Sequence, residues 1–260
     1  MMVPDDLSAA LGALGVRRPD LSLDVRWHDS VASTMDVASA LAGGGAAQGL
    51  VVVADQQTAG RGRRGRGWES PRAAGLYFSL VARPPLRANA SLPLLTLAAG
   101  VAVRDGIQAA LGVAPQLKWP NDVLIDRRKL AGILAEGLAV GTVSQAVVIG
   151  VGLNLQPSSY PPDVAARATS LEGELGRAVE RGPLLAEILA ALWDRLATLE
   201  RSPSDILQAW RAASPSATGT RVDWDGRHGI TAGIDDSGAL LVRTASGTER
   251  VIAGELAWYL

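Results

Sequence analysis

The sequence contains no cysteine and only two histidines, His28 and His228, in a chain of 260 residues. The absence of cysteine excludes a disulfide scaffold, a thiolate-bound zinc or iron–sulfur site and a cysteine nucleophile. Because the two histidines lie far apart in the chain, an HExxH-type metal site is excluded as well. An excess of charge is also lacking, since 25 Lys and Arg against 26 Asp and Glu give a net charge of −1. This balance argues against a surface that coats nucleic acid.

Membrane and export signals are lacking too. No uninterrupted apolar run reaches the roughly 18 residues of a membrane span. The N-terminus carries Asp5 and Asp6 rather than the basic start of a signal peptide. The hydrophobic fraction of 48% and the charged fraction of 20% are typical of a folded protein. We therefore expect a cytoplasmic protein with no membrane partner.

Hydrophobic spacing predicts a mixed α+β architecture. Ser33 and Thr34 are placed to cap a helix that ends before three glycines. A second helix is indicated by Pro183 at its start and an apolar stripe along one face. We expect helices over residues 7–14, 33–41, 93–111 and 183–200, and strands over 50–54, 76–81, 117–119, 123–125, 130–136 and 146–153. A polar turn at 126–128 favours a hairpin, so the sheet is mixed and flanked by helices.

The composition changes after Ala213. Ser214, Pro215 and Ser216 have the composition of a linker. Beyond them, short strand patterns over 220–224, 229–234, 240–244 and 249–253 alternate with Asp-Gly and Ser-Gly turns. We therefore expect a domain over residues 1–213 and a small SH3-like β-barrel over 214–260.

Residues 60–67 alternate glycine with arginine and have no apolar periodicity, which predicts a loop. From Arg61 to Arg72 there are five arginines and one glutamate, a net charge of +4. Bare glycine backbone and arginine forks suit a phosphate or carboxylate, although a solvated surface loop is the alternative. The pattern also fits GxGxxG, but Pro71 and a strand follow where a dinucleotide-binding fingerprint needs a helix, so we reject that interpretation.

Three further segments carry candidate chemistry. Lys129 begins an apolar strand, so its ammonium either enters a site or lies at an exposed strand end. Asn121 and Asp122 form a turn, or they bind a nucleotide or a metal. Ser33 and Thr34, with the amides of residues 56–57, can satisfy a neutral polar ring or act only as a helix cap. Residues 150–154 are either a fourth binding segment or a strand end.

Taken together, these segments resemble the biotin–protein ligase family. The resemblance rests on Ser33-Thr34, on Gln57 followed by the Gly-Arg segment 60–66 and Trp68, on Lys-Trp-Pro-Asn-Asp at 118–122, on Lys-Leu-Ala-Gly-Ile-Leu at 129–134, and on residues 150–154. It covers residues 29–154 closely, and the small C-terminal module fits the family's usual tail. With the core starting near Asp29, the chain resembles the monofunctional type without an N-terminal DNA-binding domain.

The resemblance implies a fold and a reaction. The fold is a class II synthetase-like mixed sheet with a C-terminal SH3-like barrel. The reaction joins biotin to ATP as biotinyl-5′-AMP and then transfers biotin to a lysine of a biotin carboxyl carrier protein. ATP and Mg²⁺ are the implied cofactors, and biotin is the substrate. The implied partner is the carrier domain of a biotin-dependent carboxylase, with no DNA, and we expect a monomer or weak homodimer.

The resemblance also implies residue roles. Lys129, Arg61 and Asp122 take catalytic roles. The biotin site comprises Ser33, Thr34, Met35, Gln57, Gly60, Arg61, Gly62, Arg63, Lys129 and Gly132. The ATP site comprises Arg63, Arg66, Trp68, Asn121, Lys129 and Asn154. Metal ligands are not identified.

The resemblance also suggests a role for Asp122 in the second step and a change in the arginine loop on ligand binding. Asp122 would accept or orient the proton of the acceptor lysine in the second step. The loop from Arg61 to Arg72 would be mobile without ligand and would order over the adenylate, because ordering its glycines costs entropy that a bound anion must offset.

Two alternatives stay open at the level of sequence. One is lipoate or octanoate attachment on the same fold, although Gly43-Gly44-Gly45 lacks the flanking residues of that family's glycine-rich signature. The other is an RNA-binding module that uses the arginine loop and the small barrel. RNA binders usually place stacking aromatics near the basic patch, whereas here only Trp68, Tyr77 and Phe78 are close in sequence.

Overall fold

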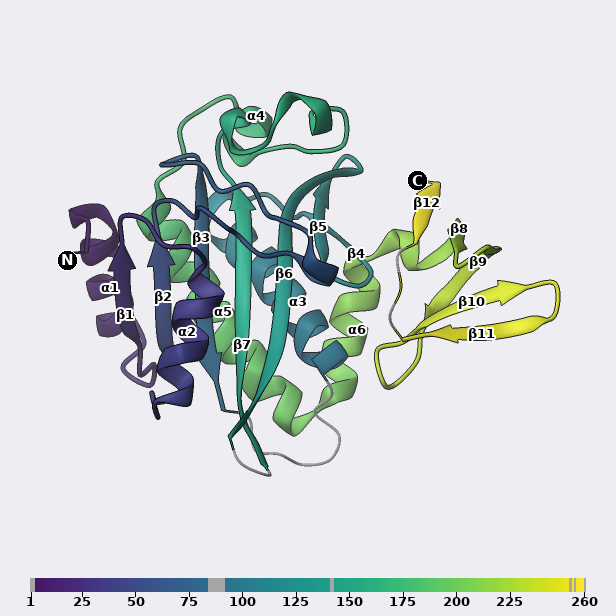
Figure 1. The fold of residues 1–260 in the computed structure, drawn as a ribbon, viewed down its shortest axis with the longest axis horizontal. Coiled ribbons are helices and arrows are strands. Elements are labelled where there is room, and N and C mark those ends of the chain that lie inside the picture. The colour runs from purple at the N-terminus through teal and green to yellow at the C-terminus, as the bar shows by residue number, and fades with distance from the viewer. Residues whose placement is uncertain (1–2, 84–91, 141–142, 253, 255, 260) are drawn as a thin grey trace.

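The computed structural model describes residues 3–83, 92–140, 143–252, 254 and 256–259. It contains a large mixed sheet and a small antiparallel sheet, which lie side by side (Figure 1). The large sheet has the strand order β1-β2-β3-β7-β6-β5-β4. Its first two strands are parallel and every other neighbouring pair is antiparallel. The predicted α+β class with a mixed sheet is therefore confirmed.

The strands of the large sheet are short at its edges and long at its centre. They are β1 (Asp24–His28), β2 (Leu50–Ala54), β3 (Gly75–Ala82), β4 (Gln116–Lys118), β5 (Asp122–Ile125), β6 (Arg128–Val140) and β7 (Val143–Asn154). All positions of β2 and β3 are buried. Their near-continuous apolar runs are what strands covered on both faces require.

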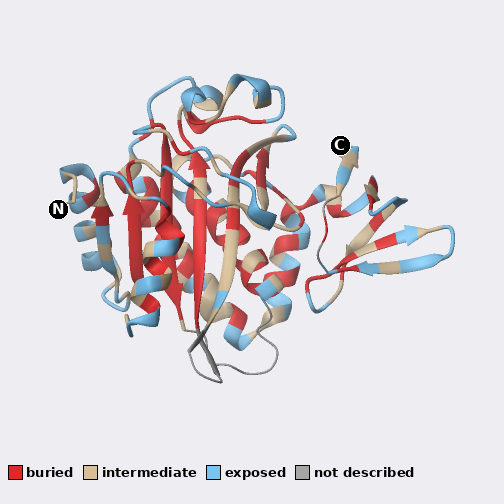
Figure 2. Cartoon of the chain, in the orientation of Figure 1, coloured by how far each residue is buried: buried red, intermediate tan, exposed pale blue. Residues whose placement is uncertain are grey.

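Helices cover the two faces of this sheet unequally. One face packs against α1 (Asp5–Arg17), α3 (Leu92–Leu111), α5 (Arg181–Arg201) and α6 (Pro203–Ala213), whereas α2 (Thr34–Gly43) lies on the other (Figure 1). Alternation along β2 follows this division: Val51 and Val53 join the larger core, and Leu50 and Val52 join the core beneath α2. Several β6 positions on the side of α2 stay only partly buried, although Leu134 and Leu138 pack against the core beneath that helix (Figure 2).

Helix α3 is the central helix of the larger core. Gly106 allows it to approach α5 closely, since a Cβ there would lie 2.5 Å from the Ile188 Cα. By length and composition α3 is apolar enough to cross a membrane, although its apolar residues do not form one uninterrupted run. However, 61% of its most apolar window is buried inside the protein. This burial is that of a core helix.

The C-terminal module is a five-stranded antiparallel sheet of order β11-β10-β9-β8-β12. Its strands are β8 (Thr218–Trp224), β9 (Arg227–Ile234), β10 (Leu240–Thr244), β11 (Gly247–Val251) and β12 (Ala257–Tyr259). The prediction of a small all-β module at the C-terminus is thus confirmed. The predicted boundary at residue 213 coincides with the end of α6, and the division into two domains stays a prediction.

Several elements differ from expectation. The sequence patterns missed β1, α6, β12 and the one-turn helix α4 (Leu171–Leu175). The segment expected to be a linker forms a 3-10 turn over Pro215–Ala217. Arg63–Gly65 also forms a 3-10 turn within the predicted loop. The strand expected over 249–253 ends at Val251, and residue 253 lies outside the described residues.

Candidate functional site

A cavity of about 220 Å³ opens beside the N-terminal end of α2, over strands β6 and β7 of the large sheet. Most of the predicted site residues line it, namely Ser33, Thr34, Met35, Gln57, Arg61, Gly62, Arg63, Arg66, Trp68, Asn121, Asp122, Lys129 and Gly132. Two predicted residues, Gly60 and Asn154, do not line it. Segments far apart in sequence therefore meet at one place, which is the geometric requirement for the predicted site.

One end of the cavity is a neutral polar network around Gln57. The Gln57 Oε1 accepts from the Thr34 amide at 2.8 Å and from the Thr34 hydroxyl at 3.1 Å, and its Nε2 donates to the Ser70 hydroxyl at 2.8 Å. The Thr34 hydroxyl also lies 2.8 Å from that of Ser79 on β3. Ser33 accepts from the Met35 amide at 3.2 Å and caps α2. The helix-cap interpretation of Ser33 and its place in the cavity are therefore compatible.

The floor of the cavity is made of glycines on β6 and β7. Gly132 pairs directly with Gly152 in the sheet. A Cβ at Gly152 would collide with the Trp68 Nε1, and one at Gly132 would lie 3.1 Å from the Trp68 Cζ3. Trp68, which belongs to the arginine loop, thus lies flat on backbone that only glycine leaves bare. Its Nε1 is buried against Gly152 without a hydrogen-bond partner.

Charged groups gather at the opposite end, where β4, β5 and β6 begin or end. The Asp122 carboxylate lies 2.6 Å from the Lys129 Nζ and 3.0 Å from the Lys118 Nζ. Burial alone would raise the pKa of Asp122, but the two ammonium groups outweigh it and hold that pKa below its ordinary value. The Lys129 Nζ also lies 5.4 Å from the centre of the Trp68 ring. Asp122 is consequently a weak proton acceptor that fixes both lysines.

The arginine loop is internally hydrogen-bonded. The Gly62 amide donates to the Arg66 carbonyl, and the Trp68 amide donates to the Gly60 carbonyl, both at 2.8 Å. A Cβ at Gly60 would collide with the Trp68 carbonyl oxygen, so Gly60 permits the neck of the loop to close. The role of Gly60 in this structure is therefore steric.

Two arginines of the loop have different surroundings. Arg61 forms ion pairs with Asp36 at 2.9 Å and with Glu136 at 2.6 Å, which attach the loop to α2 and β6. Arg63 is partly buried, and its Nη1 donates to the Asn121 Oδ1 at 3.4 Å. Burial and the neighbouring arginines lower the pKa of the Arg63 guanidinium, although Asp122 opposes this. An anion that neutralised Arg63 would relieve that repulsion.

Asn154 lies beneath the site rather than in it. Only 3% of its surface is exposed. Its Nδ2 donates to the backbone carbonyls of Thr169 at 3.0 Å and Lys129 at 3.4 Å. Asn154 thus supports the backbone of Lys129, and its predicted contact with the nucleotide stays a prediction.

Sequence reasoning missed several residues of the cavity. Lys118 was recognised only as part of a motif, although it lines the cavity and pairs with Asp122. Ser79 on β3 supports Thr34 by a hydrogen bond without lining the cavity itself, and a serine within an apolar strand could have been noticed in the sequence. Nothing in the local sequence marked Leu256 and Trp258 of the C-terminal segment, which also line the cavity. Among the residues that the structure describes, no group of three His, Cys, Asp or Glu side chains is placed to hold a metal.

Comparisons with known proteins agree with this geometry. Residues 27–154 match the model of the biotin/lipoate A/B protein ligase family, and residues 228–256 match the model of the biotin protein ligase C terminal domain. A biotin–[acetyl-CoA-carboxylase] ligase of Paracoccus denitrificans is 39% identical over 79% of this chain and 88% of its own length. The bifunctional ligase/repressor BirA of Bacillus subtilis is 34% identical over 97% of this chain and 79% of its own length.

A solved structure shares the fold. The biotin protein ligase from Aquifex aeolicus, in complex with biotin and ATP, superposes with a TM-score of 0.78 at 26% identity. The match covers 90% of this chain and 98% of that chain. The resemblance in sequence thus extends to the arrangement of the sheets in space.

Proposed function

The chain belongs to the biotin/lipoate A/B protein ligase family, and from that premise we propose how it activates biotin with ATP and transfers it to a carrier lysine. The observation that carries the proposal is one cavity with a neutral polar end and a cationic end. The neutral end suits an uncharged ureido ring, and the cationic end suits a carboxylate beside a phosphate. Trp68 spans the floor between them.

The first step brings two anions together. A biotin carboxylate oxygen attacks the α-phosphorus of ATP, a new P–O bond forms, and the bond to pyrophosphate breaks. Repulsion between the reactants must be offset by fixed cations in a site shielded from water. Lys129 and Arg63 supply these charges from beside the Asn121-Asp122 turn, and the bare backbone of Gly132 allows close approach of biotin.

Asp122 is assigned a positioning role, while its predicted role of accepting or orienting the acceptor proton stays a prediction. In the second step the carrier amine attacks the anhydride carbonyl, releases AMP and loses a proton. A carboxylate whose pKa two lysines keep low takes that proton poorly. Asp122 would also hold Lys129 where the charge develops, so its loss would slow adenylate formation as well as transfer.

Arg61 is assigned to the biotin carboxylate through exchange of partners. In this structure its guanidinium is shared by Asp36 and Glu136. Those ion pairs are partly exposed and individually weak, so a bound carboxylate can compete for the same fork. The loop would then transfer its attachment from α2 and β6 to the ligand.

The remaining assignments concern cofactor and partners. Mg²⁺ would accompany the triphosphate, because this ion favours phosphate oxygens with at most one or two protein carboxylates. The acceptor would be the carrier domain of a biotin-dependent carboxylase, and the chain would act in the cytoplasm as a monomer or weak homodimer without binding DNA. Arg66, Asn121 and Lys118 would face the nucleotide.

Transfer to a carrier tests the proposal directly. The protein, biotin and Mg-ATP are incubated with a purified biotin carboxyl carrier domain, and intact mass and AMP are followed. We expect a single biotinyl addition with one AMP per addition, which requires the carrier's own lysine. The control is a carrier in which that lysine is replaced by arginine. Labelling of the control at an equal rate would contradict site-specific transfer.

A further inference from the structure

One of the places where the C-terminal module touches the catalytic segment is the turn that joins β9 to β10. The turn spans residues 235–239, and Gly238 at its tip adopts a φ of +82°. A Cβ at Gly238 would lie 3.1 Å from Leu97 and 3.3 Å from Leu94, so the tip is seated against α3. This contact joins the two sheets at a defined point rather than by a flexible tether.

The tip of the turn holds Trp119, which lies in the middle of the Lys-Trp-Pro-Asn-Asp segment. The Trp119 Nε1 donates to the Gly238 carbonyl at 3.0 Å. Trp119 is among the largest fully buried side chains, with 1% of its surface exposed. A buried indole N–H without a partner costs about 1–3 kcal/mol, so the Gly238 carbonyl fixes where this ring lies.

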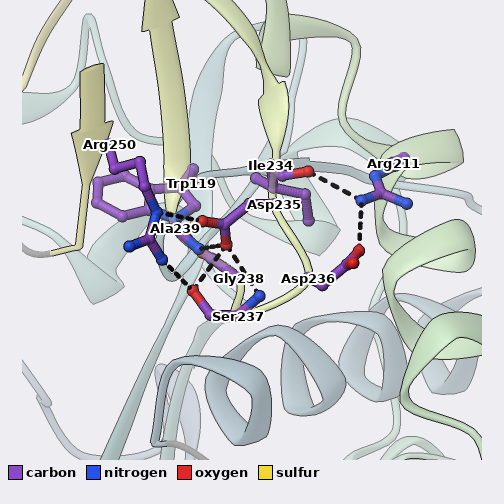
Figure 3. Close-up of polar contacts among 9 residues, drawn as sticks. All are labelled: Trp119, Arg211, Ile234, Asp235, Asp236, Ser237, Gly238, Ala239 and Arg250. Carbon is purple, nitrogen blue, oxygen red and sulfur yellow. Dashed lines mark hydrogen bonds and ion pairs between the residues drawn. The ribbon is translucent and has the colours of Figure 1, made fainter. Parts of the chain in front are cut away.

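Asp235 determines the shape of the turn (Figure 3). Its Oδ1 accepts from the Ser237 amide at 2.9 Å, the Ser237 hydroxyl at 2.7 Å and the Ala239 amide at 3.0 Å. Its Oδ2 accepts from the Arg250 Nε at 2.6 Å. One carboxylate thus organises both sides of the tip that presents the Gly238 carbonyl. By contrast, the neighbouring Asp236 side chain is fully exposed and lies 3.9 Å from Arg211.

Trp119 is flanked by the charged groups of the site. Lys118 precedes it, and its Nζ pairs with Asp122, which in turn holds Lys129. The Lys118 Nζ also lies 6.0 Å from the centre of the ring of Trp258 on β12. The C-terminal module therefore contacts two consecutive residues of this segment.

We propose that Asp235 is a positioning residue for biotin activation, acting through the turn and Trp119 on the Lys118–Asp122–Lys129 charge cluster. The inference rests on the proposed function. It assigns to the C-terminal module a part in the first chemical step, at the cationic end of the cavity. The polar end around Gln57 is built from Thr34, Ser70 and Ser79, none of which belongs to the turn, so biotin recognition should depend little on Asp235.

The test compares Asp235→Ala with Asp236→Asn, a charge change in the same turn that leaves its bonds intact. Biotin-dependent exchange of pyrophosphate into ATP is measured, with kcat and KM determined separately. We expect Asp235→Ala to lower kcat about ten-fold, because small misplacement of reacting groups has large effects on rate. KM for biotin should stay within about two-fold. Asp236→Asn should match the wild type, and Asp235→Asn, which keeps an Oδ1 acceptor for the two amides, should recover part of the loss.

A double-mutant comparison separates positioning from general destabilisation. Trp119→Phe removes the N–H donor, so adding Asp235→Ala to it should lower kcat much less than Asp235→Ala does alone. Amide hydrogen exchange of residues 116–122 should rise in Asp235→Ala and not in Asp236→Asn. Fully additive effects, or an unchanged kcat in Asp235→Ala, would overturn the inference. Absence of biotin-dependent exchange in the wild type would instead overturn the proposed function itself, whereas the hydrogen-exchange result reports on the turn independently.

Discussion

At the scale of single residues, the site depends on a carboxylate that serves as an anchor. Asp122 was expected to handle a proton because it is the only carboxylate of the recognised motifs. The structure places it between Lys118 and Lys129, where its charged form is favoured. The sequence contained all three residues, but only the fold shows that they meet, since the contact depends on the pairing of β4, β5 and β6.

Asp122→Asn should reveal this anchoring in the pH dependence of stability. Because the folded-state pKa of Asp122 is lowered, its contribution is complete above the unfolded pKa of about 3.9 and is lost as pH falls through the lowered value. The difference in free energy of unfolding between wild type and variant should therefore be constant from about pH 5 to 8 and shrink at lower pH. Urea titrations across this range provide the measurement, with exposed Asp163→Asn as the control. A difference that grows on acidification would contradict the assignment.

Gly152→Ala should disturb the floor of the cavity without unfolding the protein. Its Cβ would occupy the place of the Trp68 ring, so the loop residue must move away from β7. We expect kcat/KM for biotin-dependent exchange to fall about ten-fold or more. The control is Gly12→Ala in α1, where a Cβ meets nothing within 4 Å; it should leave activity unchanged and add about 0.5–1 kcal/mol of stability. Full activity of Gly152→Ala would contradict the placement of Trp68.

At the scale of elements, the sequence predicted what local pattern determines. The helix from Leu92 and the strands β2, β3 and β7 follow from long apolar runs with clear ends. Strand β1 was missed because Asp24 and Arg26 point to solvent at the sheet edge, leaving Trp27 as its only buried position. Helix α6 did carry a signal, since Ile206, Trp210 and Ala213 are helically spaced. β12 carried none, because three residues become a strand only by pairing with β8.

The arginine loop forms more contacts than its glycine-rich composition suggests. Internal hydrogen bonds and the two ion pairs of Arg61 hold it in the conformation of this structure. The expectation that the loop is mobile without ligand and orders over the adenylate stays a prediction. Exchange of partners by Arg61 offers a physical route, because the ligand replaces contacts that already exist.

Glu136→Gln should loosen the loop and make this exchange measurable. Removing one of the two carboxylates that hold Arg61 should raise the rate of trypsin cleavage within residues 61–66 several-fold without ligand. Biotin plus ATP should slow cleavage in both proteins to a similar rate, since the ligand then supplies the anion. Cleavage after Arg227, the first residue of β9, reports general trypsin activity. Equal cleavage with and without ligand in both proteins would contradict loop ordering.

At the scale of the whole molecule, the cavity is completed by parts that are distant in sequence. Leu256 and Trp258 line it together with residues near the N-terminus. This closure was not predictable, because the C-terminal module was recognisable only as a β-module with no stated contact. The recognised motifs contain the charged residues of the site. Which of these residues contact one another is determined by packing between distant parts of the chain.

The increase in Tm on ligand binding should show that the polar and the cationic ends of the cavity bind the same adenylate molecule. An adenylate touches the polar and the cationic ends together, so biotin with ATP should raise Tm more than biotin with an α,β-methylene analogue that cannot form it. Binding at about 100 times Kd adds roughly 2.7 kcal/mol. Thermal scans of wild type and Lys129→Ala check this, and the excess should vanish in the variant. An equal rise with ATP and with the analogue would mean that no adenylate accumulates.

The most direct test of the central claim is pyrophosphate exchange into ATP with biotin, with lipoate and with no acid, measured side by side on the wild-type protein. The account predicts rapid exchange with biotin and only background exchange with the other two, because the polar network around Gln57 is matched to a neutral ring with donors and an acceptor. It further predicts that Lys129→Ala abolishes the biotin signal. Exchange supported equally well by lipoate, or exchange that needs no acid, would contradict it.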